Sequence, residues 1–180
     1  MKRDYREYKS LIRNIKDYPK EGIIFRDITP LLENLEAFEE SIDELCSQIS
    51  SLDFNKIACI DARGFIVGVA CALKMSKNFF LIRKKGKLPF DTFTHDYDLE
   101  YGSNTLEMHT DSLSKDDKVI IIDDLLATGG TALAAINLIK KAQAEVLALG
   151  VLIDLPDLEG RNNLFKEEVE VFSLFQFSGE

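Results

Sequence analysis

The sequence predicts an α/β protein with a mainly parallel sheet flanked by helices. Short runs of apolar and β-branched residues, typical of strands buried on both faces, alternate with longer segments whose apolar residues recur at helical spacing. This alternation indicates strands joined by right-handed helical crossovers. With 180 residues, 46% of them apolar, the chain suits one domain that buries a sizeable core.

The first part of the chain is expected to combine a short helix, a short strand and a longer helix. We expect the short helix over residues 6–14, before a turn that contains Pro and Gly. The strand is expected over residues 23–27, and Thr29-Pro30 is typical of a helix cap followed by proline at the first helical position. Apolar residues at helical spacing then predict a helix over about residues 35–50: Phe38, Ile42, Leu45 and Ile49.

The remainder of the chain alternates strand-like and helix-like segments, apart from one long interruption. Residues 86–110 mix charged, aromatic and glycine residues, with weak alternation only near residues 104–109. Loops of this length in compact domains are usually functional or mobile, so a mobile loop is expected here. The other elements are expected as strands over residues 56–60, 79–83, 119–122, 145–153 and 169–174, and as helices over residues 65–75 and 131–142.

The segment from Val119 to Thr131 points most directly to a function. Its apolar strand is followed by two adjacent acids, Asp123 and Asp124, and then by a Thr/Gly-rich turn that opens a helix. Ligands of open α/β sheets bind at this carboxyl edge, and the bare N–H groups at the start of a helix suit a phosphate. The acids suit sugar hydroxyls, or a cation bound through water. The segment therefore predicts a receptor for a phosphorylated sugar, although it has neither a Walker A pattern nor a dinucleotide fingerprint.

Charge and composition limit the classes of partner. The net charge of −9 argues against nucleic acid, whereas the basic cluster Arg83-Lys84-Lys85-Gly86-Lys87 indicates an anionic ligand. No run approaches the ~18 apolar residues of a membrane span, and the charged start lacks the apolar core of a signal peptide, so we expect a cytoplasmic protein without membrane contact. Cys46, Cys59 and Cys71 lack metal-site spacing and are expected to be buried and reduced.

Several motifs resemble those of one enzyme family. Four apolar residues, two acids and a loop ending Thr-Gly-Gly-Thr resemble the phosphoribosyl-pyrophosphate motif of type I phosphoribosyltransferases. From about Ile12 to Phe175, further segments resemble the adenine phosphoribosyltransferases, in the family order and with compatible spacing. These segments are Asp17-Tyr18-Pro19, residues 22–32, Ala62-Arg63-Gly64-Phe65, residues 82–89, residues 97–102 and residues 155–164.

The resemblance implies a type I phosphoribosyltransferase fold in a single domain over residues 1–180. It implies a small N-terminal hood over roughly residues 1–34 and a mobile catalytic loop over roughly residues 86–110. The implied activity is purine salvage by transfer of the 5-phosphoribosyl group from phosphoribosyl pyrophosphate to adenine, which gives AMP and pyrophosphate. The resemblance further implies Mg²⁺ held mainly by the phosphates and water, with no direct protein ligand, and a homodimer whose basic loop reaches across the interface.

The resemblance also assigns residues to the parts of phosphoribosyl pyrophosphate. The loop after the acids takes the 5′-phosphate through hydroxyls and backbone N–H groups, the acids face the ribose, and the turn at residues 61–64 joins the basic cluster in binding pyrophosphate. A cis peptide bond is expected before Arg63. The residues are Ala127, Thr128, Gly129, Gly130 and Thr131 for the 5′-phosphate, Asp123 and Asp124 for the ribose, and Ala62, Arg63, Gly64, Arg83, Lys84 and Lys87 for pyrophosphate.

The same resemblance assigns the base and the proton transfer. An aromatic ring stacks on adenine opposite a leucine, and backbone groups beside the ring contact the purine edge. An acid in the mobile loop moves a proton at the purine, and the adjacent tyrosine helps to exclude water. On the residues alone, core packing is a serious alternative for Phe25, and without its Leu-Glu-Tyr-Gly context Glu100 would be interpreted as a solvated loop acid. The residues are Ile24, Phe25, Arg26 and Leu126 for adenine, and Glu100 and Tyr101 for catalysis.

Two other functions compete with this one. Transfer to hypoxanthine, guanine or xanthine would use the same phosphate site, but the segment from Asp17 to Leu32 resembles the adenine enzymes. A regulatory protein that senses phosphoribosyl pyrophosphate would need a nucleic-acid-binding module. The net charge of −9 argues against such a module, and the presence of Glu100 favours catalysis over regulation. The sequence departs from the family at Ala62, where many relatives have Ser, and at Phe90, where relatives usually have Gly.

Overall fold

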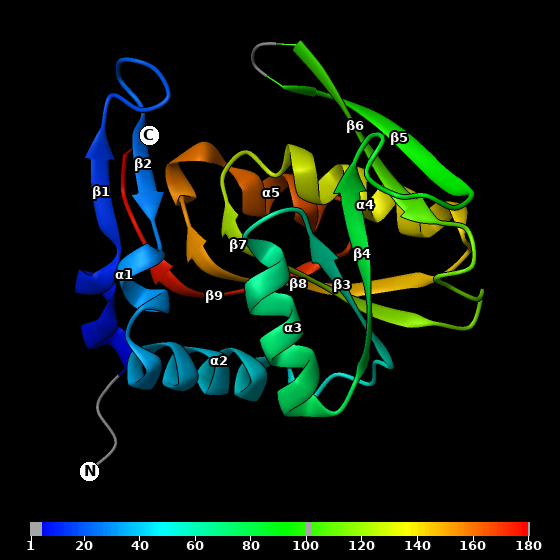
Figure 1. Cartoon of the computed structure of the whole chain (residues 1–180), viewed down its shortest axis with the longest axis horizontal. Coiled ribbons are helices and arrows are strands. Elements are labelled where there is room, and N and C mark those ends of the chain that lie inside the picture. The colour runs from blue at the N-terminus through cyan, green and yellow to red at the C-terminus, as the bar shows by residue number, and fades with distance from the viewer. Residues whose placement is uncertain (1–4, 100–101, 180) are drawn as a thin grey trace.

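A central sheet flanked by helices, together with a small separate sheet at one end, makes up the protein (Figure 1). The computed structural model describes residues 5–99 and 102–179. The strands are β1 (Arg13–Lys16), β2 (Ile24–Asp27), β3 (Lys56–Ile60), β4 (Asn78–Lys84), β5 (Thr92–Leu99), β6 (Gly102–His109), β7 (Lys118–Leu126), β8 (Glu145–Asp154) and β9 (Glu170–Gln176). The helices are η1 (Tyr5–Leu11), α1 (Thr29–Leu32), α2 (Leu35–Ile49), α3 (Gly64–Met75), α4 (Gly130–Lys141), η2 (Pro156–Leu158) and α5 (Gly160–Phe165), of which η1 and η2 are 3₁₀-helices.

The central sheet is mainly parallel, as predicted, with the strand order β5-β6-β4-β3-β7-β8-β9. The strands from β4 to β9 in this order pair in parallel, while β5 and β6 form an antiparallel hairpin at the β4 edge. In β3, Ile57 and Cys59 pack in the core that contains α2 and α3, whereas Ala58 and Ile60 pack in the core that contains α4. This burial on both faces explains the continuous apolar run of the strand.

The helix α2 confirms the element predicted from apolar periodicity over residues 35–50. Its N-cap is Asn34, whose side-chain oxygen accepts a hydrogen bond from the Ala37 N–H at 3.1 Å. Ile42, Leu45 and Ile49 are all buried against the sheet. Full burial of a side chain of this kind stabilises a fold by roughly 1.5–3 kcal/mol, so the apolar stripe fixes the position of α2.

The N-terminal segment, here called the hood (residues 5–34), folds around the antiparallel pair β1-β2. In Figure 1 it stands beside β9, with the C-terminus next to β2. Arg26 is 5% exposed, and its guanidinium donates to Asn14 Oδ1 at 2.6 Å and to the Ser178 carbonyl oxygen at 3.1 Å. These bonds join the two hood strands to each other and to the C-terminal segment.

Two expectations about the hood are wrong in detail. Residues 6–14 do not form an α-helix: η1 ends at Leu11 and β1 begins at Arg13, because pairing with β2 outweighs local helix propensity. Thr29 is the first residue of α1 rather than its cap. Its N–H and hydroxyl donate to the Asp27 carboxylate at 2.9 and 2.6 Å, so Asp27 satisfies the start of the helix.

The segment expected to be one long loop contains a regular hairpin. β5 and β6 are each 8 residues long and pair antiparallel. The hairpin also packs on α4, where the Lys141 ammonium donates to the Thr94 carbonyl and His95 Nε2 lies 3.4 Å from Asn137 Nδ2. Such cross-strand and cross-element contacts leave little trace in local alternation, which is why residues 104–109 gave a weak signal. The mobility of this segment stays a prediction.

Expectations for the cysteines and for the membrane can also be compared with the structure. Cys46, Cys59 and Cys71 are buried and free, as predicted. Burial raises the pKa of the Cys59 thiol to about 12, which keeps the thiol protonated near neutral pH. Among residues 5–99 and 102–179, no helix has the length and apolar character needed to span a membrane.

Candidate active site

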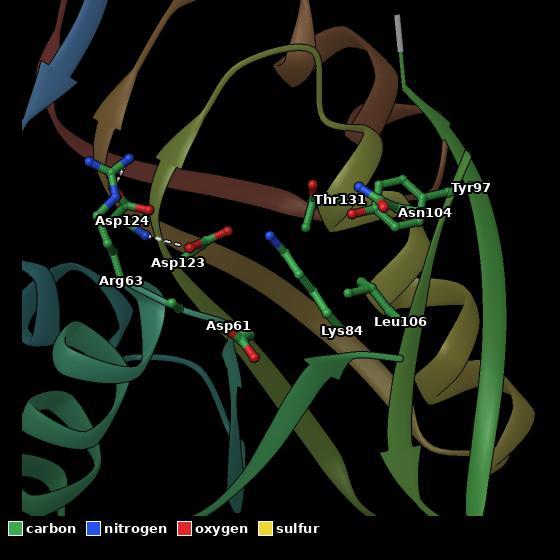
Figure 2. A pocket seen from close by; sticks show the side chains of 10 residues that line it. Asp61, Arg63, Lys84, Tyr97, Asn104, Leu106, Asp123, Asp124 and Thr131 are labelled. Atoms are coloured by element: carbon green, nitrogen blue, oxygen red, sulfur yellow. Dashed lines mark hydrogen bonds and ion pairs between the residues drawn. The ribbon is translucent and has the colours of Figure 1, made fainter. Parts of the chain in front are cut away.

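The carboxyl ends of β3 and β7 meet at one edge of the sheet and bring two turns together, as expected for parallel neighbours. The turn at residues 61–64 follows β3, and the loop at residues 127–131 follows β7. Between these turns and the hairpin lies a cavity of about 350 Å³ lined by Asp61, Ala62, Arg63, Lys84, Tyr97, Asn104, Leu106, Asp123, Asp124 and Thr131 (Figure 2). A second cavity of about 290 Å³ lies along the loop and shares Arg63, Asp123, Asp124 and Thr131 with the first.

A tight turn carries β7 into α4 and shapes the predicted phosphate loop, residues 127–131. Gly129 adopts a left-handed conformation (φ 86°) that side chains rarely allow, and α4 begins at the next residue. The loop packs closely against α5: a Cβ on Gly160 would clash with the Ala127 carbonyl oxygen. The first N–H groups of a helix lack partners within it, so this turn offers donors to an anion.

Asp123 and Asp124 lie within β7, which continues its pairing with β8 as far as Leu126. The Asp123 carboxylate accepts the Asp124 N–H at 2.8 Å, and Asp124 is 6% exposed. Burial raises the pKa of both carboxyls. The charge of Asp124 raises the pKa of Asp123 further, whereas Arg63 opposes the rise at Asp124. Ionised carboxylates are therefore costly here, and hydroxyl donors from a ligand would offset that cost.

Arg63 connects this edge of the sheet to the hood. Its Nη2 lies 2.7 Å from Asp124 Oδ2, and its Nη1 donates to the Arg26 carbonyl oxygen at 3.0 Å. The guanidinium carbon lies 4.8 Å from the centroid of the Phe25 ring, within the range of a cation–π contact. The side chain predicted to bind pyrophosphate thus contacts the groups predicted to bind the base.

The turn at residues 61–64 approaches β7 closely. A Cβ on Gly64 would lie 2.6 Å from Asp123 Oδ1, so this approach requires glycine. The cis peptide bond joins Asp61 and Ala62, one bond before the predicted position. The structure places the turn against the acids, whereas the resemblance predicted only that a cis bond lies in this turn, and local residue types do not distinguish neighbouring bonds within it.

The members of the predicted basic cluster differ in their surroundings. Lys84 lines the larger cavity. Arg83 instead donates from Nε to Asp61 at 3.0 Å, and its guanidinium lies 5.5 Å from the centroid of the Phe65 ring. Lys87 is exposed, and its carbonyl oxygen accepts a bond from Arg83 at 3.4 Å. Lys84 is therefore the lysine best placed to meet a phosphate in the cavity.

Glu107 supports the turn of this cluster, a role that nothing in the sequence pattern signals. It is 6% exposed, and its Oε2 accepts the Gly86 N–H at 2.9 Å. Gly86 has a φ of 77°, so the turn needs a residue that tolerates the left-handed region. Alternation identifies Leu106 and Met108 as apolar positions of β6, but it cannot reveal a buried acid between them.

The predicted base-binding residues lie mainly on β2. The Phe25 ring is half-buried and meets the Tyr18 ring edge-on at 5.3 Å. Ile24 is also half-buried. The Arg26 side chain bonds Asn14 and Ser178, and its carbonyl oxygen accepts a bond from Arg63 at the site. Leu126 is 2% exposed and lines the smaller cavity. Backbone groups of β2 and one aromatic ring are thus available beside the acids.

The predicted catalytic residues Glu100 and Tyr101 lie outside the described residues, and their roles stay predictions. The strands on either side of them contribute Tyr97 and Asn104 to the cavity. Figure 2 shows both side chains across the cavity from the acids of β7. Neither residue stood out in the sequence, although both belong to or adjoin the recognised segment at residues 97–102.

α5 supports the phosphate loop and was not expected from periodicity. The Asn163 amide donates to the Thr128 carbonyl oxygen at 3.0 Å, and a Cβ on Gly129 would lie 2.9 Å from Leu164 Cδ1. A helix of 6 residues is too short to show a helical repeat. Its one signal was the resemblance of residues 155–164 to a family segment.

Known proteins share this sequence and fold. The phosphoribosyl transferase domain family matches residues 31–174. Adenine phosphoribosyltransferase of Halothermothrix orenii is 50% identical over 170 residues, which cover 94% of this chain and 99% of that protein. The crystal structure of adenine phosphoribosyltransferase from Thermoanaerobacter pseudethanolicus has a TM-score of 0.93 and 40% identity, covering 97% of this chain and 100% of that one.

The enzyme from Saccharomyces cerevisiae, solved with D-2,5-dideoxy-2,5-imino-altritol 1,6-bisphosphate and adenine, has a TM-score of 0.88 and 33% identity, covering 95% of this chain and 98% of that one. The mainly parallel sheet flanked by helices agrees with these likenesses. The chain therefore belongs to the adenine phosphoribosyltransferases, within the type I phosphoribosyltransferase family.

Proposed function

We propose that this chain transfers the 5-phosphoribosyl group of phosphoribosyl pyrophosphate to adenine, giving AMP and pyrophosphate in purine salvage. The observation that carries this proposal is the pair of joined cavities, which gathers the loop at residues 127–131, the acids of β7 and the turn at residues 61–64. These groups suit a phosphate, a sugar and a pyrophosphate in turn, with the Phe25 ring beside them. A relative solved with both a sugar-like bisphosphate and adenine supports the assignment.

The 5′-phosphate is proposed to bind at the start of α4. Backbone N–H groups and the positive end of the helix dipole favour an anion there. The Thr128 side chain is exposed and the Thr131 side chain lines both cavities, so both hydroxyls are available as further donors. Ala127, Gly129 and Gly130 contribute through the backbone, since they have no polar side-chain atoms.

The ribose is proposed to lie against Asp123 and Asp124. Loss of pyrophosphate gives the ribose oxocarbenium character, as in glycoside chemistry, and nearby carboxylates stabilise positive charge. Ribose hydroxyls donate to the charged form of these acids, whose pKa values burial raises. Substrate binding therefore favours the ionised state that the transition state requires.

Pyrophosphate is proposed to bind across the turn at residues 61–64. Arg63 and Lys84 both line the larger cavity and supply charge-assisted donors, while Ala62 and Gly64 supply backbone groups. Charge that builds on the departing pyrophosphate is stabilised by donors already in place. Arg83 and Lys87 add positive charge at the end of β4.

Mg²⁺ is proposed as the cofactor, bound chiefly to the substrate phosphates. Among the described residues, no group of three or more His, Cys, Asp or Glu is arranged to hold a metal, and Asp61 and Asp124 pair with Arg83 and Arg63. Mg²⁺ prefers phosphate and water oxygens with few carboxylates, so this donor set fits a hydrated ion that Asp123 or Asp124 reaches through water. When bound, the ion neutralises charge on the phosphates.

Adenine is proposed to stack on Phe25, with Leu126 on the opposite side, and to bond the backbone of Ile24 and Arg26. The Phe25 ring and the Arg26 carbonyl already contact the planar Arg63 guanidinium. This contact supports the proposal that the same two groups can bind adenine, which is also planar and donates hydrogen bonds. A backbone carbonyl and N–H together match the mixed donors and acceptors of adenine.

Glu100 is proposed as the general acid or base at the purine, with Tyr101 helping to exclude water. Support comes from their neighbours Tyr97 and Asn104, which line the cavity across from the ribose-facing acids. A proton transfer group of this kind typically contributes ~10²–10⁴-fold to a rate.

A homodimer is proposed to form through α3 and β4. Ile66 and Leu73 are 45% and 74% exposed and, seven residues apart, lie on one face of α3. Phe79, which is 44% exposed, lies on β4. Exposed apolar surface of this kind marks protein interfaces. Leu73→Glu should convert a dimer to a monomer in light scattering, and an unchanged mass would exclude this face.

The deciding experiment is AMP formation from adenine, phosphoribosyl pyrophosphate and Mg²⁺, with hypoxanthine and guanine in parallel. AMP from adenine without nucleotide formation from the other bases is the expected result. Turnover of another base instead of adenine would keep the phosphate site but overturn the assignment of β2. No product from any base would overturn the proposed activity.

A further inference from the structure

The Arg63 guanidinium occupies the place proposed for the base. It stacks at 4.8 Å from the centroid of the Phe25 ring, donates to the Arg26 carbonyl oxygen at 3.0 Å and pairs with Asp124 at 2.7 Å. Figure 2 shows the guanidinium beside Asp124 and away from Lys84, which points into the larger cavity. One cation thus bridges the gap between the hood and β7.

A purine needs the same gap and the same groups. Its ring would stack on Phe25, and its amino group would donate to a backbone carbonyl of β2. Because the base becomes joined to a ribose held at Asp124, it must lie between Phe25 and that acid. The guanidinium fills this space, so base binding requires Arg63 to move.

We propose that Arg63 closes the base site in the free protein and opens it when a phosphorylated ligand draws the guanidinium away. This inference rests on the proposed function. The Arg63 side chain is 33% exposed, which leaves it room to rotate, and it extends from the turn assigned to pyrophosphate. Phosphate oxygens offer a guanidinium paired, charge-assisted bonds, which are stronger than its bond to the Arg26 carbonyl and compete with its contact to the Asp124 carboxylate.

This arrangement couples the two substrate sites. Binding of pyrophosphate removes the group that blocks adenine, and binding of adenine frees that group for pyrophosphate, so each ligand tightens the other by the same factor. Arg63 therefore acts as a positioning residue for coupled binding, in addition to its contact with the leaving group.

Calorimetry of adenine binding, without and with saturating Mg²⁺ and inorganic pyrophosphate, tests the coupling without turnover. The unaltered protein should bind adenine weakly alone and about 10-fold more tightly, or better, with pyrophosphate. Arg63→Ala should bind adenine alone as tightly as the unaltered protein does with pyrophosphate, and pyrophosphate should add nothing further. Adenine affinity that is the same in both proteins without pyrophosphate would overturn the proposal.

Two further variants keep the test decisive. Arg63→Lys retains the charge but cannot bond the Arg26 carbonyl and Asp124 through one planar fork, so its coupling should be intermediate. If circular dichroism shows that Arg63→Ala does not fold, Arg63→Lys provides the test. Pyrophosphate would then have to raise the adenine affinity of Arg63→Lys as much as it raises that of the unaltered protein for the proposal to be rejected. Lys118→Ala removes a cation that pairs with Asp53 at the far end of β7, and its coupling should be unchanged.

Failure of this inference can be told apart from failure of the proposed function. If the unaltered protein forms AMP but both Arg63 variants keep its full coupling, the blocking role of Arg63 is wrong and the activity stands. If the unaltered protein neither forms AMP nor binds adenine with or without pyrophosphate, the base site itself is wrong.

Discussion

Two parts of the molecule face the same cavity but are held in different ways. The platform, formed by the carboxyl ends of β3 and β7 with the loop at residues 127–131, lies where parallel strands pair on both sides. The hairpin β5-β6 meets the sheet at the edge, where β6 pairs with Arg83 and Lys84 of β4, and rests on α4. In Figure 1 the hairpin extends beyond the edge of the sheet.

This difference separates two requirements of the proposed reaction. Groups that bind phosphate and ribose must keep fixed positions, and a buried sheet edge supplies them. A group that approaches the base and then allows product to leave must move, and an edge hairpin with few pairs to the sheet opens at lower cost. Substitutions in the hairpin should therefore affect turnover, except where a hairpin residue supports the basic cluster, as Glu107 does. Substitutions in the platform should affect substrate affinity and stability.

The largest effect is expected for Glu100→Ala in the hairpin segment. Loss of the proposed proton transfer group should lower turnover ~10²–10⁴-fold. Affinity for phosphoribosyl pyrophosphate should remain close to that of the unaltered protein, because the platform is intact. Steady-state kinetics with calorimetric titration of the substrate measures both quantities. Equal turnover in the variant would remove Glu100 from the mechanism. It would also contradict the assignment of turnover to the hairpin and of substrate affinity to the platform.

Glu107→Ala tests the junction between the hairpin and the basic cluster. The substitution removes the acceptor of the Gly86 N–H, and loss of a buried bond of this kind costs about 1.5–3 kcal/mol. We expect KM for phosphoribosyl pyrophosphate to rise about 10-fold while kcat changes less, because the turn that carries Lys84 loses its support.

Glu107→Gln is the matched control for that junction. Its amide oxygen can still accept the Gly86 N–H, so KM should return toward the original value. If KM is unchanged in both variants while thermal stability falls in Glu107→Ala, Glu107 has a structural role without influence on the site.

The contrast between the two parts also explains which features the sequence could predict. The platform could be predicted from the sequence because local patterns determine it. Val119–Ile122 form a buried apolar run, and Gly129 marks a turn that needs a positive φ. The acids were placed at the correct edge, although β7 extends through them to Leu126. That extension depends on pairing with β8, which the run itself does not encode.

The hairpin could not be predicted from local sequence patterns because non-local contacts determine it. His95 and Thr94 contact residues of α4 that lie 42 and 47 positions further along the chain, and no local repeat records that packing. Glu107 is similarly defined by one bond to a distant turn. The bridge from Arg63 to the hood depends on how the hood folds back onto the sheet, so residue type alone indicated a cation but not its place in the free protein.

Gly160→Ala tests the support beneath the platform. The new methyl group would meet the Ala127 carbonyl oxygen and Leu126, and backbone atoms cannot yield cheaply. Overpacking of this kind costs about 1–3 kcal/mol, so we expect a lower melting temperature and weaker binding of phosphoribosyl pyrophosphate. Asn162→Ala, at an exposed neighbouring position in α5, is the control. Lost stability with unchanged affinity would show that α5 does not shape the phosphate loop.

The smallest effect, and the one of opposite sign, is expected for Asp123→Asn. Burial and the neighbouring acid raise the pKa of Asp123 in the folded protein, so the folded state binds more protons than the unfolded state above the ordinary pKa. The free energy of unfolding contributed by this group therefore falls as pH rises from about 4 through the raised pKa. Asn cannot ionise, yet its amide oxygen can still accept the Asp124 N–H.

The variant should therefore be more stable than the unaltered protein above the raised pKa, by about 1 kcal/mol, while its ribose phosphate affinity falls. Urea unfolding followed by circular dichroism between pH 5 and pH 9 measures the difference, which should widen as pH rises. Asp116→Asn, at an exposed position before β7, controls for the loss of one charge. Reduced stability across the whole range would mean that Asp123 is ionised and satisfied in the free protein. The platform would then already stabilise the negative charge that the substrate is proposed to require.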